Sequence, residues 1–157
     1  VGTITGPTTD RTTVREAISA MRAGGGTALL DSLIEAAQLL KAAQGRRAIV
    51  LITDGWDENS KARVEDALAS LRQAETTLYV VAIGGVAGVS LRGGDALRNL
   101  SEQTGGRIFF PPRETEMITV ADRIVTDARS RFLVTYTPRN QRKDGSWRAI
   151  SVQVPPG

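Results

Sequence analysis

The sequence predicts an α/β domain, a parallel sheet flanked by helices, with an antiparallel β-hairpin after it. Two continuous apolar runs, "RAIVLIT" and "TLYVVAIG", have the composition of strands covered on both faces. Segments with apolar residues at helical spacing separate these runs, which favours parallel strands joined by helices. Near the end, apolar and polar residues alternate in "WRAISVQV" after a turn signal at Asp144 and Gly145. This alternation is typical of a hairpin strand with one solvated face.

The elements can be assigned in order from their start and stop signals. Thr13 and Glu16 have the spacing of a capping box, so the first helix is expected to begin there and to stop at the glycines 24–26. A second helix should begin just after Thr27 and end near Gly45. The remaining elements are, in chain order, the strand "RAIVLIT", a helix capped by Asn59 or Ser60, the strand "TLYVVAIG", a short helix through Leu97 and Leu100, the short strand "RIFF" and a last helix from Met117 to Ala128. We expect residues 1–131 to form the α/β domain and residues 132–157 to form a hairpin packed on it.

Composition excludes several classes of function. The chain of 157 residues fits one domain and contains neither cysteine nor histidine, which rules out disulfides, thiolate metal sites and imidazole catalysis. A metal ion would therefore have to be a hard cation held by oxygen ligands. Aromatic residues make up 4% of the chain and do not interleave with basic ones, so nucleic-acid binding has no support. No apolar run approaches the ~20 residues that cross a bilayer, so membrane insertion is not expected.

Thr27 and Asp54 are the candidate metal ligands. In open α/β sheets, ligands bind beyond the carboxyl ends of the strands, and Asp54 directly follows "RAIVLIT". Thr27 starts the helix before this strand, so both oxygens are expected at one edge of the sheet. A hydroxyl and a carboxylate suit Mg²⁺, which usually keeps several waters. Each residue also has an ordinary structural explanation, Thr27 as a helix N-cap and Asp54 with Gly55 as a turn.

Trp56 and Asp57 are the candidate partner-contact residues beside this edge. An aromatic side chain next to a ligand edge suits a contact residue, although Trp56 could equally fold over a helix end. Asp57 and its neighbour Glu58 also suit solvation of the loop and the N-terminus of the following helix, where the helix dipole favours negative charge. Asp31, one turn into its own helix, has the same explanation.

The glycine-rich stretch "GGVAGVSLRGG", residues 84–94, raises an alternative function. It follows a buried strand, as the phosphate loop of a small-molecule or nucleotide-binding α/β enzyme domain would. Its spacing gives neither Gly-x-Gly-x-x-Gly nor Gly-Lys-Ser/Thr, so a connecting loop is expected instead. The chain also offers no histidine base and no Ser-x-x-Lys motif. The sequence therefore favours a binding module over an enzyme.

Four motifs resemble, in this order, a von Willebrand factor A (VWA) domain: "GGGTALLDSL", "RAIVLITDGWDENS", "LSEQTGGRIFF" and "RFLVTYTPRNQRKDGSWRAISVQV". The last is similar to a subgroup from Acidobacteria and related bacteria, in which a strand pair follows the core. The resemblance implies a Rossmann-like fold with a metal-ion-dependent adhesion site (MIDAS). In that site Thr27 would be a ligand and Asp54 would orient metal-bound water. The family's Asp-x-Ser-x-Ser motif, expected after a first strand, is absent, which indicates either a piece of a longer protein or a variant that dispenses with the metal.

The resemblance also implies a function, an adhesion or scaffolding module exported to the bacterial envelope or secreted. Mg²⁺ would bridge the sheet edge to an acidic side chain of a protein partner, with Trp56 framing the contact. A purely structural role is a third possibility, in which another chain or segment supplies the missing strands. Without those strands the edge of "RAIVLIT" is expected to be unpaired and prone to self-association.

Overall fold

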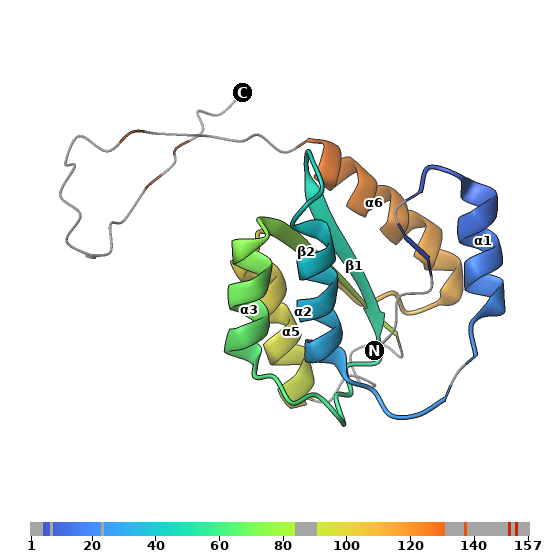
Figure 1. Ribbon diagram of the computed structural model, residues 1–157, viewed down its shortest axis with the longest axis horizontal. Coiled ribbons are helices and arrows are strands. Elements are labelled where there is room, and N and C mark those ends of the chain that lie inside the picture. The colour runs from blue at the N-terminus through green and yellow to red at the C-terminus, as the bar shows by residue number, and fades with distance from the viewer. Residues whose placement is uncertain are drawn as a thin grey trace.

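The computed structural model describes residues 5–6, 8–22, 24–83 and 91–130, together with positions 137, 151 and 153. Helices and strands alternate along most of this part of the chain (Figure 1). The elements are α1 (Arg11–Ala20), α2 (Leu29–Leu40), β1 (Arg47–Thr53), α3 (Val64–Gln73), β2 (Thr76–Ala82), α5 (Leu91–Gln103), β3 (Ile108–Phe109), the 3₁₀ turn η1 (Glu114–Glu116) and α6 (Met117–Arg129). None of the described helices has the length and apolar composition that crossing a membrane requires.

The strands form a parallel sheet in the order β1-β2-β3. Arg47 of β1 lies beside Thr76 of β2, and the register continues without interruption to Thr53 beside Ala82. Continuous strands joined by helices confirm the predicted parallel α/β architecture. The predicted hairpin over residues 132–157 lies outside the described residues, apart from three isolated positions.

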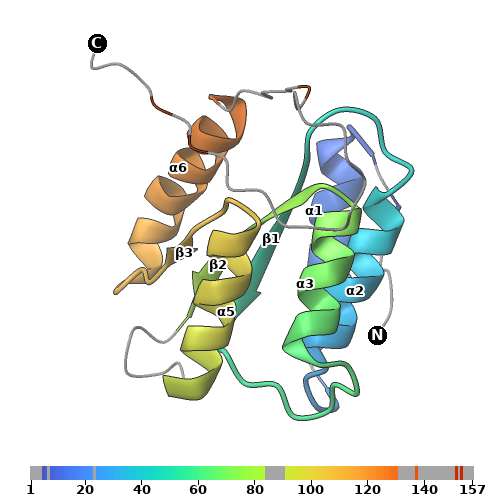
Figure 2. The ribbon, with the colours of Figure 1, turned by 90° about the vertical axis from the view of Figure 1, so that its left-hand side faces the viewer.

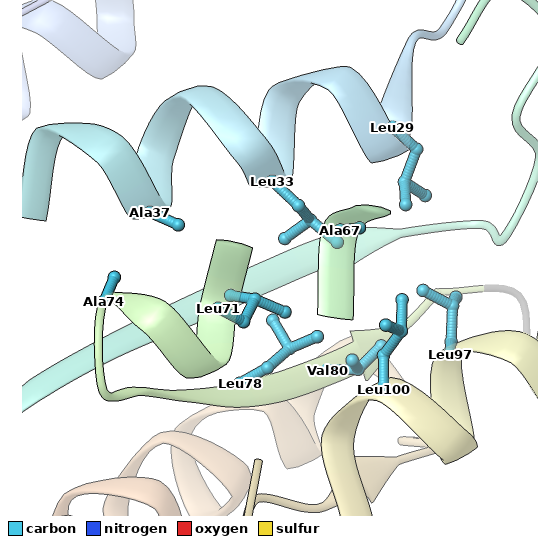
Figure 3. Close-up of a cluster of buried hydrophobic side chains, with 10 residues drawn as sticks. All are labelled: Leu29, Leu33, Ala37, Ala67, Leu71, Ala74, Leu78, Val80, Leu97 and Leu100. Carbon is cyan, nitrogen blue, oxygen red and sulfur yellow. The ribbon is translucent and has the colours of Figure 1, made fainter. Parts of the chain in front are cut away.

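The sheet separates two apolar clusters because alternate residues of β2 point to opposite faces. Leu78 and Val80 face the larger cluster, which α2, α3 and α5 close with Leu33, Leu71 and Leu100 (Figure 3). On the other face, α6 covers β2 and β3, and the buried residues there are Tyr79, Val81, Val120 and Ile124. Figure 2 shows α6 on the opposite side of the sheet from α2 and α3. Both faces of β2 are thus covered, as its apolar composition predicts.

The prediction that "RAIVLIT" is covered on both faces is wrong. Ile49 and Leu51 pack against the larger cluster, but Ala48, Val50 and Ile52 on the α6 side are exposed. The reason is that β1 is the outer strand of the described sheet and α6 packs over β2 and β3 instead. A continuous apolar run therefore does not show that both faces of a strand are covered, because the α6-side face of β1 is exposed in this structure.

The predicted capping box at Thr13 and Glu16 is also wrong. Helix α1 begins at Arg11, because the Asp10 carboxylate accepts hydrogen bonds from the backbone N–H groups of Thr12 (2.9 Å) and Thr13 (3.3 Å) and from the Thr13 hydroxyl (2.6 Å). The Thr13 hydroxyl is the largest cause that holds the pKa of Asp10 below its ordinary value, followed by the backbone groups. None of the residues of α1 is buried, so this cap rather than packing fixes where the helix starts.

The buried Tyr79 joins β2 to α6 through a partly buried hydrogen bond. Its hydroxyl donates to Asp127 Oδ2 at 2.6 Å, and Arg107 Nη2 lies 3.8 Å from the other carboxylate oxygen. We expect Tyr79→Phe to lower the free energy of unfolding by about 1–2 kcal/mol, because a buried partner of a charged group is lost. Arg107→Ala should cost about 0.5 kcal/mol or less, because the Arg107 side chain of this ion pair is 70% exposed. Urea unfolding of the two variants checks the ranking, and an equal loss in both would contradict it.

Candidate loop-edge binding site

The candidate site lies at the carboxyl end of β1, where the chain turns sharply. Thr53 is buried at the strand end, and its hydroxyl accepts a hydrogen bond from the N–H of Gly55 at 3.1 Å. Gly55 has φ +87°, a left-handed conformation that favours glycine. Asp54 is exposed between them, and its Oδ1 accepts the N–H of Trp56 at 3.1 Å. The turn thus places the Asp54 carboxylate at the surface, as the sequence predicts for either a turn residue or a ligand.

The loop after β1, residues 54–63, is hydrogen-bonded to residues 27–31, which lead into and begin α2. We call these two joined segments the loop clasp. The carbonyl of Thr27 accepts the N–H groups of Glu58 and Asn59, each at 2.9 Å. Gly26 lies so close to Asn59 that an added Cβ would overlap the Asn59 amide. The clasp therefore brings Thr27 and the loop that carries Asp54 to the same end of the sheet. The Thr27 side chain itself is exposed.

Asp57 caps α2 from the neighbouring loop. The residue in the N-cap position of that helix is Ala28, which has no side chain that can accept a hydrogen bond. The Asp57 carboxylate takes this role, with Leu29 N–H at 3.3 Å from Oδ1, Leu30 N–H at 3.3 Å from Oδ2 and Ser60 N–H at 3.1 Å from Oδ1. The prediction that Asp57 favours the N-terminus of the following helix is therefore corrected, since it serves the preceding one.

Ser60 and Asp31 complete the loop clasp: Ser60 in the loop accepts hydrogen bonds from α2, and Asp31 in α2 accepts hydrogen bonds from the loop. The Ser60 hydroxyl oxygen accepts the N–H of Leu30 at 2.9 Å and the N–H of Asp31 at 3.3 Å. The Asp31 carboxylate in turn accepts the N–H groups of Ala62 (2.9 Å) and Lys61 (3.1 Å). This use of Ser60 explains why the predicted cap of the third helix is wrong: α3 begins later, at Val64. Sequence reasoning missed the roles of Ser60 and Asp31, because their partners lie about thirty residues away along the chain.

The loop clasp makes stability depend on pH through Asp31. The N–H of Ala62, and after it that of Lys61, holds the pKa of the Asp31 carboxyl below its ordinary value of 3.8. A depressed folded-state pKa adds stability above the unfolded-state pKa and loses it as the pH falls through the folded one. We expect the urea midpoint to fall as the pH drops below about 4. Asp31→Asn should make this fall shallower, and an unchanged slope would contradict the role of the carboxylate.

Trp56 lies at the surface of the same edge, with 55% of its area exposed. The alternative expectation, that it folds over a helix end, would bury most of the indole.

Within the described residues, no three acidic, histidine or cysteine side chains gather as a metal-binding group. Residues 91–94 of the predicted loop lie in α5, which begins at Leu91, and residues 84–90 lie outside the described residues. The helix predicted there as short runs for 13 residues.

Comparison with known families decides the identity of the fold. The sequence model of the von Willebrand factor type A domain matches residues 4–123. The chain belongs to the von Willebrand factor type A family. Domains of this family commonly mediate protein interactions and often bind a metal ion at a MIDAS. The resemblance seen in the sequence is confirmed at the level of the family, and the A-type match covers the elements from α1 to most of α6.

Solved structures add a description of one similar chain. This A domain is 22% identical, with a TM-score of 0.46, to a crystal structure described as an uncharacterized membrane-spanning protein from Vibrio fischeri. The alignment covers 79% of this chain and 68% of that chain. No curated protein matches the A domain.

Proposed function

We propose that this A domain is a non-enzymatic protein-binding module, for adhesion or scaffolding, whose partner site is the edge at the carboxyl end of β1. The observation that carries the proposal is the loop clasp in a VWA domain. Backbone and side-chain hydrogen bonds fix two loops to each other at that edge and leave Thr27 and Asp54 exposed on them. Rigid loops with exposed polar groups suit recognition, because little ordering is needed on binding.

The residues at this edge offer oxygen ligands of the kind that a hard divalent cation prefers, but they offer few of them. The Thr27 hydroxyl and the Asp54 carboxylate are oxygen donors of the kind that Mg²⁺ prefers. Because no acidic cluster backs them within the described residues, most of the coordination shell would be left to water and to the partner. Bound there, the cation would supply a Lewis-acidic position for an acidic side chain of a protein ligand. Asp54, as the exposed carboxylate, would orient the metal-bound water.

Trp56 and Asp57 have different roles in the proposed site. The exposed indole of Trp56 offers apolar contact area next to Asp54 at low cost in side-chain entropy. Asp57 lies beside the contact, but its oxygens already accept backbone N–H groups of α2 and of Ser60. Its contribution to partner binding is therefore to position the loop. We further propose that the protein is exported to the cell envelope or secreted, where adhesion modules act. A second partner, another copy of the chain at the open edge of β1, would use a different surface.

A thermal-shift screen tests the proposal against the enzyme alternative. We expect MgCl₂ or MnCl₂ to raise the Tm of the wild-type domain, because a ligand that binds only the folded state stabilises it. Asp54→Ala should abolish the shift without lowering the Tm of the metal-free protein. Stabilisation by ATP or another nucleotide in the absence of metal would overturn the proposal in favour of a nucleotide-binding domain. A metal shift that survives in Asp54→Ala would overturn the assignment of the site.

A further inference from the structure

The side of β1 that faces the α6 layer is apolar and open. Val50 and Ile52 point to this side and are 49% and 55% exposed. Ile83, which follows β2, is also exposed, and its N–H donates to the carbonyl of Thr53 at the end of β1. Helix α6 leaves these side chains uncovered, because it packs over β2 and β3.

Helix α6 turns an apolar flank toward this open side. Its Asp127 faces the other way, because Oδ1 lies 3.8 Å from Nη2 of Arg107, which directly precedes β3. Val125 and Ile118 come two and nine residues before Asp127, which places both about half a turn away from it around the helix. Both side chains are exposed. We use the name open face for these five residues: Val50, Ile52, Ile83, Ile118 and Val125.

Helix α1 carries a second apolar surface. Val14, Ile18 and Met21 recur at spacings of four and three residues and so line one side of the helix. All three are exposed, and none of the residues of α1 is buried. An isolated helix this short is marginal in water, because most helical stability in proteins comes from packing of the apolar side. We call these three residues the α1 stripe.

The open face and the α1 stripe hold most of the exposed apolar side chains. Ten large hydrophobic residues are exposed in the described part of the chain, and of these only Leu39 and Trp56 lie outside the two surfaces. In the view of Figure 2, β1 lies between α6 and α1. Two apolar surfaces of one chain gain free energy by burying each other, provided that the connection between them is long enough.

We propose that α1 docks on the open face, beside α6 and antiparallel to it, and completes the second layer of helices. The direction follows from the connections. Helix α1 leads into α2, whose start is held at the carboxyl end of β1, so α1 docks with its C-terminus at that end. Helix α6 finishes at the other end of the strand, where Nη1 of Arg46 donates to the carbonyls of Ala128 (3.1 Å) and Arg129 (2.8 Å).

The α1 stripe matches the flank of α6 in length. Val14 to Met21 and Ile118 to Val125 are each a step of seven residues, about 10 Å of helix. In the antiparallel arrangement Val14 therefore meets Val125, Met21 meets Ile118, and Ile18 lies over β1.

Charge complementarity favours α1 as the occupant. On α6, Asp122 is exposed and lies one turn from both Ile118 and Val125. On α1, Arg15 is exposed and lies one turn before Ile18, beside the stripe. Antiparallel docking brings Arg15 and Asp122 together on the solvent side of the contact. Such an exposed ion pair adds little stability, but it selects the partner and the direction of packing.

The connection between α1 and α2 permits this docking. Residues 21–28 can span up to about 25 Å, more than twice the spacing of two packed helices. A short tether gives an effective concentration of about millimolar, above that of a second copy in ordinary solution. Because the connection ends at the loop clasp, docking also fixes the chain that leads to Thr27. The inference goes beyond the proposed function and requires no metal.

Engineered cysteine pairs test the docking in the full chain, which has no native cysteine. We expect Val14→Cys with Val125→Cys, and Met21→Cys with Ile118→Cys, to close intramolecularly under mild oxidation and give a monomer without reactive thiols. Facing residues of two packed helices come within the Cα range of a disulfide, about 4.4–6.8 Å. The matched control pairs Glu16→Cys with Val125→Cys, because Glu16 lies on the side of α1 opposite the stripe.

Hydrogen exchange gives a second readout without cross-linking. Docked α1 should be protected, and Val50→Asp, which places a charge in the open face, should raise the exchange of the α1 amides by at least about tenfold. Leu39→Asp is the control, because Leu39 is exposed on α2, outside both surfaces. The amides of β2 should stay protected in both variants. Should Val50→Asp lose that protection, the cysteine pairs alone decide.

Each outcome decides the inference. Intramolecular closure of at least one pair, with both thiols retained in the Glu16 control and faster α1 exchange in Val50→Asp, supports the docking of α1. Disulfide-linked dimers would show that α1 of a second copy covers the open face and would overturn it. Retained thiols in both pairs, equal closure in the control, or α1 exchange unchanged by Val50→Asp in a folded variant would overturn it too. Because neither readout requires metal, failure leaves the proposed function of the Asp54 edge untouched.

Discussion

Gly106→Ala is expected to lower the free energy of unfolding by about 3 kcal/mol, the upper end of the range for overpacking. A Cβ at Gly106 would overlap the carbonyl oxygen of Leu78 and lie 2.6 Å from its carbonyl carbon. Both are backbone atoms of β2, so no rotamer change relieves the clash. The N–H of Gly106 also donates to Ser101 at 2.7 Å, which anchors the turn after α5 and keeps it from moving away.

Thermal unfolding measures this effect directly. For a chain of this size, about 3 kcal/mol corresponds to a Tm lower by about 6–12 °C. Gly24→Ala is the matched control, because nothing lies within 4 Å of a Cβ at that position. It should change the Tm by no more than about 2 °C, as exposed substitutions usually do. Equal Tm values for Gly106→Ala and the wild-type protein would show that β2 and the turn after α5 do not approach each other this closely.

Asp57→Ala is expected to lower the free energy of unfolding by about 2 kcal/mol, the upper end of the range for a lost helix cap. The substitution leaves the N–H groups of Leu29 and Leu30 without the carboxylate, and it removes a negative charge from the N-terminus of α2. It also frees the N–H of Ser60, whose hydroxyl holds the same helix end. The Tm should fall by about 4–8 °C.

Glu58→Ala is the matched control for Asp57→Ala. It removes the same charge from the next residue, while the Glu58 N–H can still donate to the Thr27 carbonyl. Its effect should stay within about 0.5 kcal/mol. If the two variants lost the same stability, the effect of Asp57 would be one of loop charge and not of capping. Hydrogen exchange at Leu29 should rise in Asp57→Ala alone, since this amide loses its acceptor, whereas the amide of Leu30 keeps the Ser60 hydroxyl.

The order and type of the elements could be predicted from sequence patterns, because helical spacing and continuous apolar runs reflect which residues are buried. Strand β2 and helix α6 illustrate this, since both lie close to their predicted positions. The covering of β1 could not be predicted, because an apolar run does not show whether a helix crosses its second face. The start of α1 was also missed: Asp10 and Thr13 are both good capping residues, and only the geometry of the turn selects Asp10.

The candidate site was predictable in part. Placing Asp54 after the strand follows from a general rule on the carboxyl ends of parallel strands. The loop clasp had no local signal, because Ser60 and Asp57 satisfy the end of a helix that lies earlier in the chain. Because both residues stand just before α3 in the sequence, they were predicted to serve the start of α3 and not that of α2. Such long-range capping is set by how the loops meet in three dimensions.

A titration with Mn²⁺, followed by the relaxation of water protons, tests the central claim that Asp54 marks a cation-dependent binding edge. The method suits this site, because few protein ligands leave several waters on the ion. We predict saturable enhancement of relaxation with the wild-type domain, loss of it in Asp54→Ala and competition by Mg²⁺. Glu58→Ala, which removes a charge from the same loop, should retain binding. No saturable binding in the wild-type domain, or equal binding in Asp54→Ala, would contradict the account.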